Sequence, residues 1–217
     1  MITVCLCTYN RLAYAQATLR SISDNLQVTG DLNLHIADDG SPPGYVEALL
    51  SEAGRFKRVT VSDAQRGGYG RNVNLATQTL HKFDDVILML EDDWVLIRPT
   101  SFDDLIAAAR ATDGTIRLGY IGFTDTLRGV LEFHAGQLLL EFDAYSPEKH
   151  VFAGHPRLET VSRQREMGPW PEGLNPGHTE LTICGRKAVR HNVFWPMSVN
   201  PHSGYGLFAH IGTEQSY

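Results

Sequence analysis

The stretch LMLEDDW, residues 88–94, places three consecutive carboxylates at the end of an apolar run. The run from Val86 to Leu90 has the length and composition of a buried β-strand. Glu91, Asp92 and Asp93 follow it directly, and burying acidic groups this closely spaced without a partner is costly. The sequence therefore predicts positive charge opposite these carboxylates, either a metal ion or a basic side chain.

Strand-like and helix-like segments alternate on the N-terminal side of this stretch. Strands alternating with helices indicate a parallel sheet with helices on both faces, so the expected class is α/β with a mostly parallel central sheet. The predicted strands are Ile2–Cys7, Leu32–Ala37, Arg58–Val61 and Asp85–Leu90, and the predicted helices are Arg11–Leu26, a segment beginning in SPPGYVEALL (41–50), and Gly70–Leu80.

Polar or glycine-rich clusters occur where each of these strands ends. They are CTYNR after the first strand, DDG after the second, QRGGYGRN after the third and EDDW after the fourth. Open parallel sheets bind ligands at the carboxyl ends of their strands. One polar loop is ordinary, but four on the same edge predict a binding site.

The residue types in these clusters indicate which ligand fits. The dinucleotide pattern G-x-G-x-x-G is missing after the first strand, and the chain has no Walker motif. An acidic edge repels a bare phosphate, whereas carboxylates can hold a divalent cation that in turn holds a diphosphate. Asp38 and Asp39 can accept hydrogen bonds from a base and from ribose hydroxyls. The sequence predicts a nucleotide diphosphate bound through a metal.

The same motifs resemble those of the family 2 glycosyltransferases. VCLCTYNR, IADDGS, RGGYGRNVNLA and LMLEDDW are similar, in this order, to that family's first-strand, second-strand, Arg-Asn and Asp-x-Asp motifs, with Glu91 in the first position of the last. The resemblance implies a GT-A type, Rossmann-like α/β sandwich. It further implies one domain over residues 1–217, with a nucleotide-sugar-binding half at 1–98 and an acceptor-binding half at 99–217.

The resemblance also implies roles for individual residues. Asp93 would bind Mn²⁺ or Mg²⁺, and Arg71 would help to neutralise the acidic cluster. The alternative is that Arg71 alone neutralises the cluster and no metal binds. The nucleotide would contact Thr8, Tyr9, Arg11, Asp38, Asp39, Arg66, Gly67, Arg71, Glu91 and Asp92.

Family members invert the anomeric centre in a single displacement, for which a carboxylate base is expected. Two candidates are Glu180, in GHTELTICGRKAV, and Glu214, in HIGTEQSY. The resemblance implies that TICGRKAV is an acceptor-side strand and the helix after it, which places Glu214 in the position of the base and makes Glu180 the second candidate, otherwise a strand-edge carboxylate.

The remaining C-terminal residues have weaker periodicity. Strands are expected at Ile116–Phe123, Val130–His134 and Leu138–Phe142, and a long irregular loop is expected from Tyr145 to Gly177.

Charge, hydropathy and cysteine content argue against several classes of protein. The net charge of −6 disfavours general nucleic-acid binding. No stretch approaches the roughly 20 apolar residues that span a bilayer, and the N-terminus lacks the features of a signal peptide. Cys5, Cys7 and Cys184 are expected to be reduced thiols of a cytoplasmic protein.

Two other functions stay open. A nucleotidyltransferase should carry a glycine-rich, arginine-containing loop after the first strand, and CTYNR does not have that form. A non-catalytic nucleotide-sugar-binding module is possible if neither glutamate reaches an acceptor. The expected donor is a UDP-sugar, and the acceptor can be a saccharide, a lipid-linked sugar, a protein or a modified nucleobase.

Overall fold

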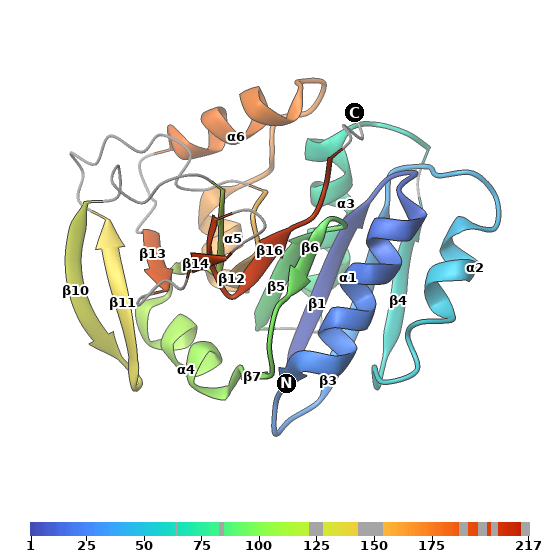
Figure 1. The fold of residues 1–217 in the computed structure, drawn as a ribbon. Coiled ribbons are helices and arrows are strands. Elements are labelled where there is room, and N and C mark those ends of the chain that lie inside the picture. Colours follow the sequence, from blue (N-terminus) through green and yellow to red (C-terminus); the bar gives the residue numbers. More distant parts are fainter. Residues whose placement is uncertain are drawn as a thin grey trace.

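The structure is a computed structural model and describes residues 1–63, 65–82, 85–121, 128–142, 154–186, 191–194, 199–200 and 204–213. A large sheet runs through the molecule in the order β10-β11-β13-β8-β12-β5-β1-β3-β4 (Figure 1). Its strands are β1 (Ile2–Thr8), β3 (Leu32–Asp38), β4 (Val59–Asp63), β5 (Val86–Glu91), β8 (Thr115–Arg117), β10 (Gly129–His134), β11 (Gln137–Phe142), β12 (Arg157–Thr160) and β13 (His191–Phe194).

Smaller sheets and helices complete the fold. The order β14-β15-β9-β16-β6 forms a second sheet, and β2 pairs with β7. These strands are β2 (Leu26–Gln27), β6 (Trp94–Leu96), β7 (Thr100–Ser101), β9 (Gly119–Ile121), β14 (Val199–Asn200), β15 (Gly204–Gly206) and β16 (Phe208–His210). The helices are α1 (Leu12–Asn25), α2 (Tyr45–Leu50), α3 (Tyr69–Leu80), α4 (Asp103–Thr112), α5 (Val161–Met167) and α6 (Pro176–Cys184).

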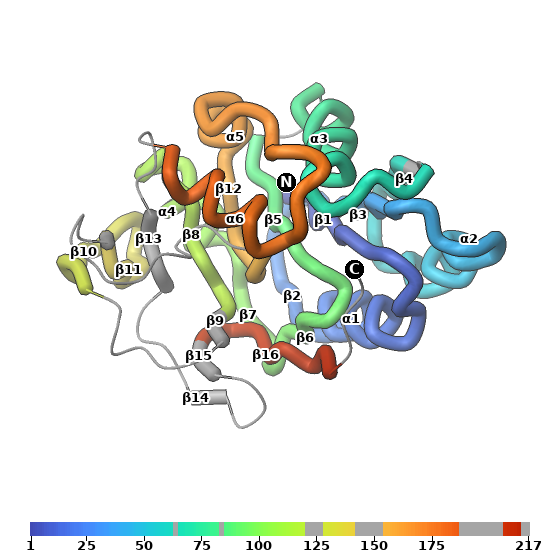
Figure 2. The backbone as a smooth tube through the Cα atoms, turned by 90° about the horizontal axis from the view of Figure 1, so that it is seen from above, coloured from blue at the N-terminus to red at the C-terminus, as the bar shows by residue number. Residues whose placement is uncertain are grey.

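The strands β4, β3, β1 and β5 are parallel throughout, as the sequence predicts. Strands β1, β3 and β5 are buried on both faces, which explains why β1 and β5 consist mostly of apolar residues. Along β1, Val4 points into a core formed with α1, α2 and α4, whereas Cys5 points into a core formed with α3, α5 and α6. Figure 2 shows α3 and α5 on one side of β1 and β5, with α1 on the other. The predicted α/β class, with helices on both faces, is confirmed.

The second half departs from the sequence prediction in two places. The strand expected at Ile116–Phe123 is divided after Arg117, because β8 belongs to the large sheet and β9 to the second sheet. The loop expected from Tyr145 to Gly177 contains β12 and α5, so that prediction is wrong for its described part. A buried ion pair between Arg157 and Glu159 puts charges inside β12, which hides its strand pattern.

The strand expected at the start of TICGRKAV is also wrong, whereas the helix expected after it falls largely outside the described residues. Thr182 to Cys184 form the last turn of α6. The helix begins at Pro176, and the side chain of Asn175 accepts a hydrogen bond from the His178 N–H at 2.9 Å. An Asn cap followed by proline is a typical helix start. Glu180 is therefore a helical residue and not a strand-edge carboxylate.

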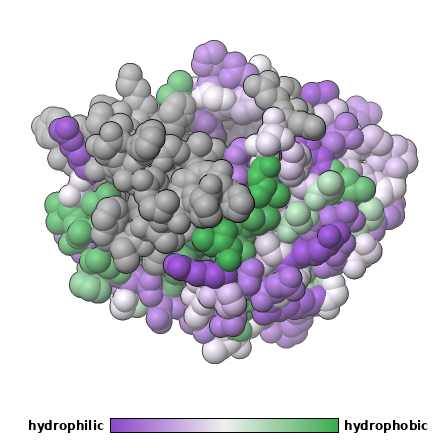
Figure 3. All heavy atoms as spheres, in the orientation of Figure 1, coloured by the Kyte–Doolittle hydropathy of each residue, from purple (hydrophilic) through white to green (hydrophobic). Residues whose placement is uncertain are grey.

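The coloured part of the face in Figure 3 is mixed in hydropathy. One apolar area lies over β10, where Val130, Leu131 and Phe133 are exposed. Among the described residues, no helix combines the length and apolar character needed to cross a membrane. Cys5, Cys7 and Cys184 form no disulfide bond within the described part of the chain.

Candidate active site

Parallel pairing brings the polar clusters after β1, β3 and β5 to one edge of the sheet. Cys7 lies opposite Glu91, and Thr8 lies opposite Asp38. The N–H of Asp39 donates to the Thr8 carbonyl oxygen at 3.0 Å, which holds the first two loops together. The edge predicted from the sequence is therefore formed by adjacent strands.

Asp92 is a buried link between β5 and the segment after β1. Its carboxylate accepts hydrogen bonds from the Thr8 hydroxyl at 2.8 Å and from the Tyr9 N–H at 3.3 Å. Its carbonyl oxygen accepts from the Thr18 hydroxyl at 2.8 Å. Burial raises the pKa of Asp92 to about 6, although the Arg11 charge acts against this rise. These bonds hold Asp92 in place and orient the residues around it.

Arg11 supplies the positive charge opposite the carboxylates. Its guanidinium donates to Asp93 Oδ2 at 2.7 Å and also binds Asp92 Oδ1. The expectation that Arg71 neutralises the cluster is wrong, because Arg71 donates to the carbonyl oxygen of Gln65 at 2.8 Å. Arg11 follows β1, the direct neighbour of β5, whereas Arg71 follows β4 at the far end of the sheet.

One carboxylate oxygen of Asp93 has contacts with neighbouring side chains, and the other is available to a further ligand. Its Oδ2 contacts Arg11 and lies 3.2 Å from His210 Nε2. Its Oδ1 is buried and accepts no hydrogen bond from the described part of the chain. Burial acts to raise the pKa of Asp93, but the hydrogen bond with His210 and the charge of Arg11 outweigh it and lower that pKa. Asp93 is therefore an ionised carboxylate with an unused acceptor atom.

Glu91 and Glu180 meet across the backbone of Gly154. A Cβ atom at Gly154 would collide with Glu91 Oε1 and would lie 3.1 Å from Glu180 Oε1. Glu180 also accepts a hydrogen bond from the Gly154 N–H. Burial, followed by repulsion from Asp93 and Glu180, raises the pKa of Glu91 well above its ordinary value. The fold thus adds Glu180, from α6, to the acidic cluster. Glu214 lies outside the described residues.

The residues predicted to surround the nucleotide lie along the same edge. Asp38 accepts hydrogen bonds from the N–H and hydroxyl of Ser41, which closes the loop after β3. Arg66 donates to the Tyr9 hydroxyl at 3.0 Å, and its Cζ lies 4.3 Å from the centroid of the Tyr9 ring. This contact is a cation–π pair between two of the predicted site residues.

Asp39 anchors the glycine-rich loop before α3. Its carboxylate accepts from the N–H groups of Gly67 at 2.8 Å and Gly68 at 3.0 Å. Asp39 itself is 1% exposed, so the acceptor side of both bonds is sheltered from water. This arrangement makes Asp39 a structural anchor as well as a predicted nucleotide contact.

Asp39→Ala is expected to lower the free energy of unfolding by about 1–3 kcal/mol, because two partly buried N–H groups lose their acceptor. Urea denaturation measures the change, and nucleotide binding should weaken in parallel because the loop loses its anchor. Asp31→Ala is the control, since Asp31 is 44% exposed in its salt bridge with Lys57 and such pairs contribute little. Equal losses of unfolding free energy in Asp39→Ala and Asp31→Ala would contradict the anchoring role.

The acidic cluster fits a hard divalent cation. It offers carboxylate oxygens from Glu91 and Asp93, and oxygen atoms are the ligands that Mn²⁺ and Mg²⁺ prefer. The unused, buried Oδ1 atom of Asp93 is the feature that a cation would explain. Gly212 also approaches closely, since a Cβ atom there would collide with Asp93 Oδ2.

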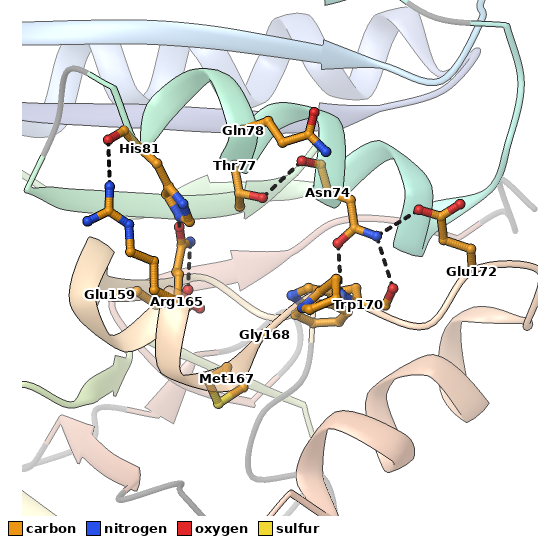
Figure 4. A pocket seen from close by; sticks show the side chains of 12 residues that line it. Asn74, Thr77, Gln78, His81, Glu159, Arg165, Met167, Gly168, Trp170 and Glu172 are labelled. Carbon is orange, nitrogen blue, oxygen red and sulfur yellow. Dashed lines mark hydrogen bonds between the residues drawn. The ribbon is translucent and has the colours of Figure 1, made fainter.

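A pocket with a volume of about 350 Å³ lies elsewhere, between α3 and the segment containing α5 and Trp170 (Figure 4). Its polar side chains bind one another. Asn74 donates to the Trp170 carbonyl oxygen at 3.0 Å and to Glu172 at 2.8 Å, and His81 lies 2.8 Å from Gln164. None of the predicted site residues lines this pocket. These bonds fasten the Trp170 segment to α3, whose first turn carries Arg71.

Comparison with solved structures finds chains of similar fold. TarS of S. aureus has 15% identity and a TM-score of 0.67, and the match covers 98% of this chain and 37% of TarS. Residues 1–349 of TarS in complex with UDP-GlcNAc have 16% identity and a TM-score of 0.66, with 99% and 59% covered. The mannosyltransferase PcManGT from Pyrobaculum calidifontis, in complex with GDP-Man and Mn²⁺, has 15% identity and a TM-score of 0.55, with 90% and 54% covered.

These identities show likeness of fold alone, and the chain spans less than two thirds of each of these proteins. No curated protein matches the sequence. The family model described as Glycosyl transferase family 2 matches residues 3–128, which include the polar clusters after β1, β3, β4 and β5. Because this match spans more than half of the residues, the chain belongs to glycosyl transferase family 2.

Proposed function

We propose that the protein transfers a sugar from a nucleoside diphosphate sugar, of the UDP class, to an acceptor hydroxyl with inversion at the anomeric carbon. The observation that carries this proposal is that Glu180 lies beside Glu91 at the carboxyl end of β5, the strand that Asp93 follows. These residues come from two separate parts of the chain. One part follows the nucleotide-side strands, and the other is the helix α6.

The donor side consists of the loops after β1, β3 and β4. Thr8, Tyr9, Asp38 and Asp39 would surround the base and ribose, with Arg66, Gly67 and Arg71 beside the nucleotide. Support for uridine comes from TarS, which has been solved with UDP-GlcNAc and with UDP. The carboxylates of Asp38 and Asp39 already bind backbone N–H groups, so in this proposal they shape the pocket and present their remaining acceptor capacity.

Asp93 and Glu91 would hold Mn²⁺ or Mg²⁺ in this proposal. A bound divalent cation would neutralise charge on the departing nucleoside diphosphate. PcManGT supports this part, because it has been solved with both a nucleotide sugar and Mn²⁺. Asp92 would orient the loop after β1 through its bonds to Thr8 and Tyr9.

Glu180 is the proposed base. As the acceptor oxygen attacks the anomeric carbon, its proton passes to the Glu180 carboxylate and the bond from that carbon to the diphosphate breaks. Glu180 is supported by its place beside Glu91, held by the Gly154 N–H. Glu214 is the second candidate, because it follows Thr213 in a segment whose Gly212 lies against Asp93.

The test is a thermal-shift screen of nucleotide sugars with and without Mn²⁺, followed by measurement of nucleoside diphosphate release. We expect UDP-sugars to raise the melting temperature more with Mn²⁺ than without it. Candidate acceptors are a saccharide, a lipid-linked sugar, a protein and a modified nucleobase, and the productive one should accelerate UDP release. A screen in which no nucleotide sugar stabilises the protein would contradict the proposal. We also propose a cytoplasmic location, which is supported by cysteines that form no disulfide bond in the described part of the chain.

A further inference from the structure

We propose that Arg11 is an internal counter-ion that competes with the divalent cation for Asp93, so that metal and nucleotide bind together and metal alone binds weakly. This inference rests on the metal-dependent donor binding proposed above, and it concerns what Arg11 does before the donor arrives.

The guanidinium of Arg11 is held in a sheltered, forked arrangement. It donates to Asp93 at 2.7 Å, and its other terminal nitrogen binds Asp92. The Arg11 side chain is 11% exposed, and those of Asp92 and Asp93 are 1% and 5% exposed. Ion pairs with so little solvent are stronger than surface pairs, and the planar fork of arginine suits two carboxylates. Arg11 is therefore a firmly bound counter-ion in this state.

A cation that binds Asp93 meets this guanidinium directly. Oδ2 is already in contact with Arg11 and His210. Binding at Oδ2 would require Arg11 to withdraw, and binding at Oδ1 would place two positive charges on the same carboxylate. Both routes cost electrostatic energy in a site with little water. The metal alone must therefore overcome Arg11 before it can bind.

A nucleoside diphosphate changes this balance. Its negative charges offer the displaced guanidinium a new partner close to the site. The ring of Tyr14 can also bind the displaced guanidinium by a cation–π contact, since its centroid lies 5.8 Å from Arg11 Cζ. Each ligand then lowers the cost of binding the other, and this coupling is reciprocal by linkage.

The experiment is calorimetric titration of Mn²⁺ into wild type and Arg11→Gln, first without nucleotide and then with saturating UDP. Without UDP, the variant is expected to bind Mn²⁺ roughly 10- to 100-fold more tightly, because no ion pair has to be broken. UDP should enhance Mn²⁺ binding less in the variant than in wild type. Arg20→Gln is the matched control, because Arg20 lies on α1, the helix that Arg11 precedes, and pairs with Glu52 at the surface. Arg20→Gln should bind Mn²⁺ with the affinity of wild type, both without and with UDP.

The outcomes separate this inference from the proposed function. If wild type binds Mn²⁺ with UDP but Arg11→Gln binds Mn²⁺ alone no more tightly than wild type, the competition is disproved and the proposed function stands. If neither protein binds Mn²⁺ even with UDP, the metal part of the proposed function is wrong and the inference falls with it. Should Arg11→Gln not fold, Arg11→Lys replaces it, since lysine keeps the charge but loses the fork. Its Mn²⁺ affinity without UDP should also rise, and an unchanged affinity would overturn the inference.

Discussion

Glu180→Gln is expected to slow glycosyl transfer by about 10²–10⁴-fold, the usual contribution of a general base. Glutamine keeps the size of the side chain and can still accept the hydrogen bond from the Gly154 N–H, but it cannot take a proton from the acceptor. Nucleotide-sugar affinity should stay near that of wild type, because the donor contacts come from other loops. Single-turnover kinetics at saturating donor, together with titration of the nucleotide sugar, measure the two quantities separately.

Glu214→Gln is the comparison that decides between the two candidate bases. We expect it to retain most of the transfer rate. If Glu214→Gln transfers sugar slowly and Glu180→Gln transfers it at the wild-type rate, Glu214 is the base. If both variants keep wild-type rates, neither glutamate is the base. Glu172→Gln serves as a control, since Glu172 is an exposed glutamate that binds Asn74 away from the acidic cluster.

Asp93→Ala should weaken Mn²⁺-dependent binding of UDP by roughly 100-fold or more, given that even residues behind a metal ligand commonly contribute 10- to 100-fold. The fold should persist, because Arg11 keeps its ion pair with Asp92 and is not left as an isolated buried charge. Calorimetry with UDP, at several Mn²⁺ concentrations, gives both the affinity and its dependence on metal.

Asp104→Ala is the matched control for this experiment, because Asp104 lies exposed in the first turn of α4. It should lose a few tenths of a kcal/mol of stability from the helix terminus and no nucleotide affinity. An Asp93→Ala protein that binds UDP with wild-type metal dependence would show that Asp93 is not a ligand.

The sequence predicts the donor side well because local signals and topology agree there. The strands β1, β3 and β5 are buried on both faces, and β1 and β5 are mostly apolar runs that are easy to detect. Parallel pairing then places the residues that follow these strands at the same edge of the sheet. This explains why Thr8, Asp38 and Glu91 could be grouped before the structure was known.

Other features depend on contacts that no local pattern contains. Arg11 and Arg71 both follow a strand, and only the order β5-β1-β3-β4 shows that Arg11 is next to the carboxylates. Arg157 and Glu159 neutralise each other inside β12, so a buried strand carries the composition of a surface segment. Glu180 reaches the cluster because α6 packs over α3, a contact between residues far apart in sequence.

The insertion of β12 between β5 and β8 has a consequence for synthesis on the ribosome. Strand β5 is complete at Glu91, but one of its two neighbours is made from Arg157–Thr160. A nascent chain that has emerged only through the donor-side strands therefore carries a long, apolar and unpaired sheet edge, the feature that promotes aggregation between polypeptides. The nucleotide-side strands alone form an unfinished sheet, and translation must continue to Thr160 before this edge can be covered.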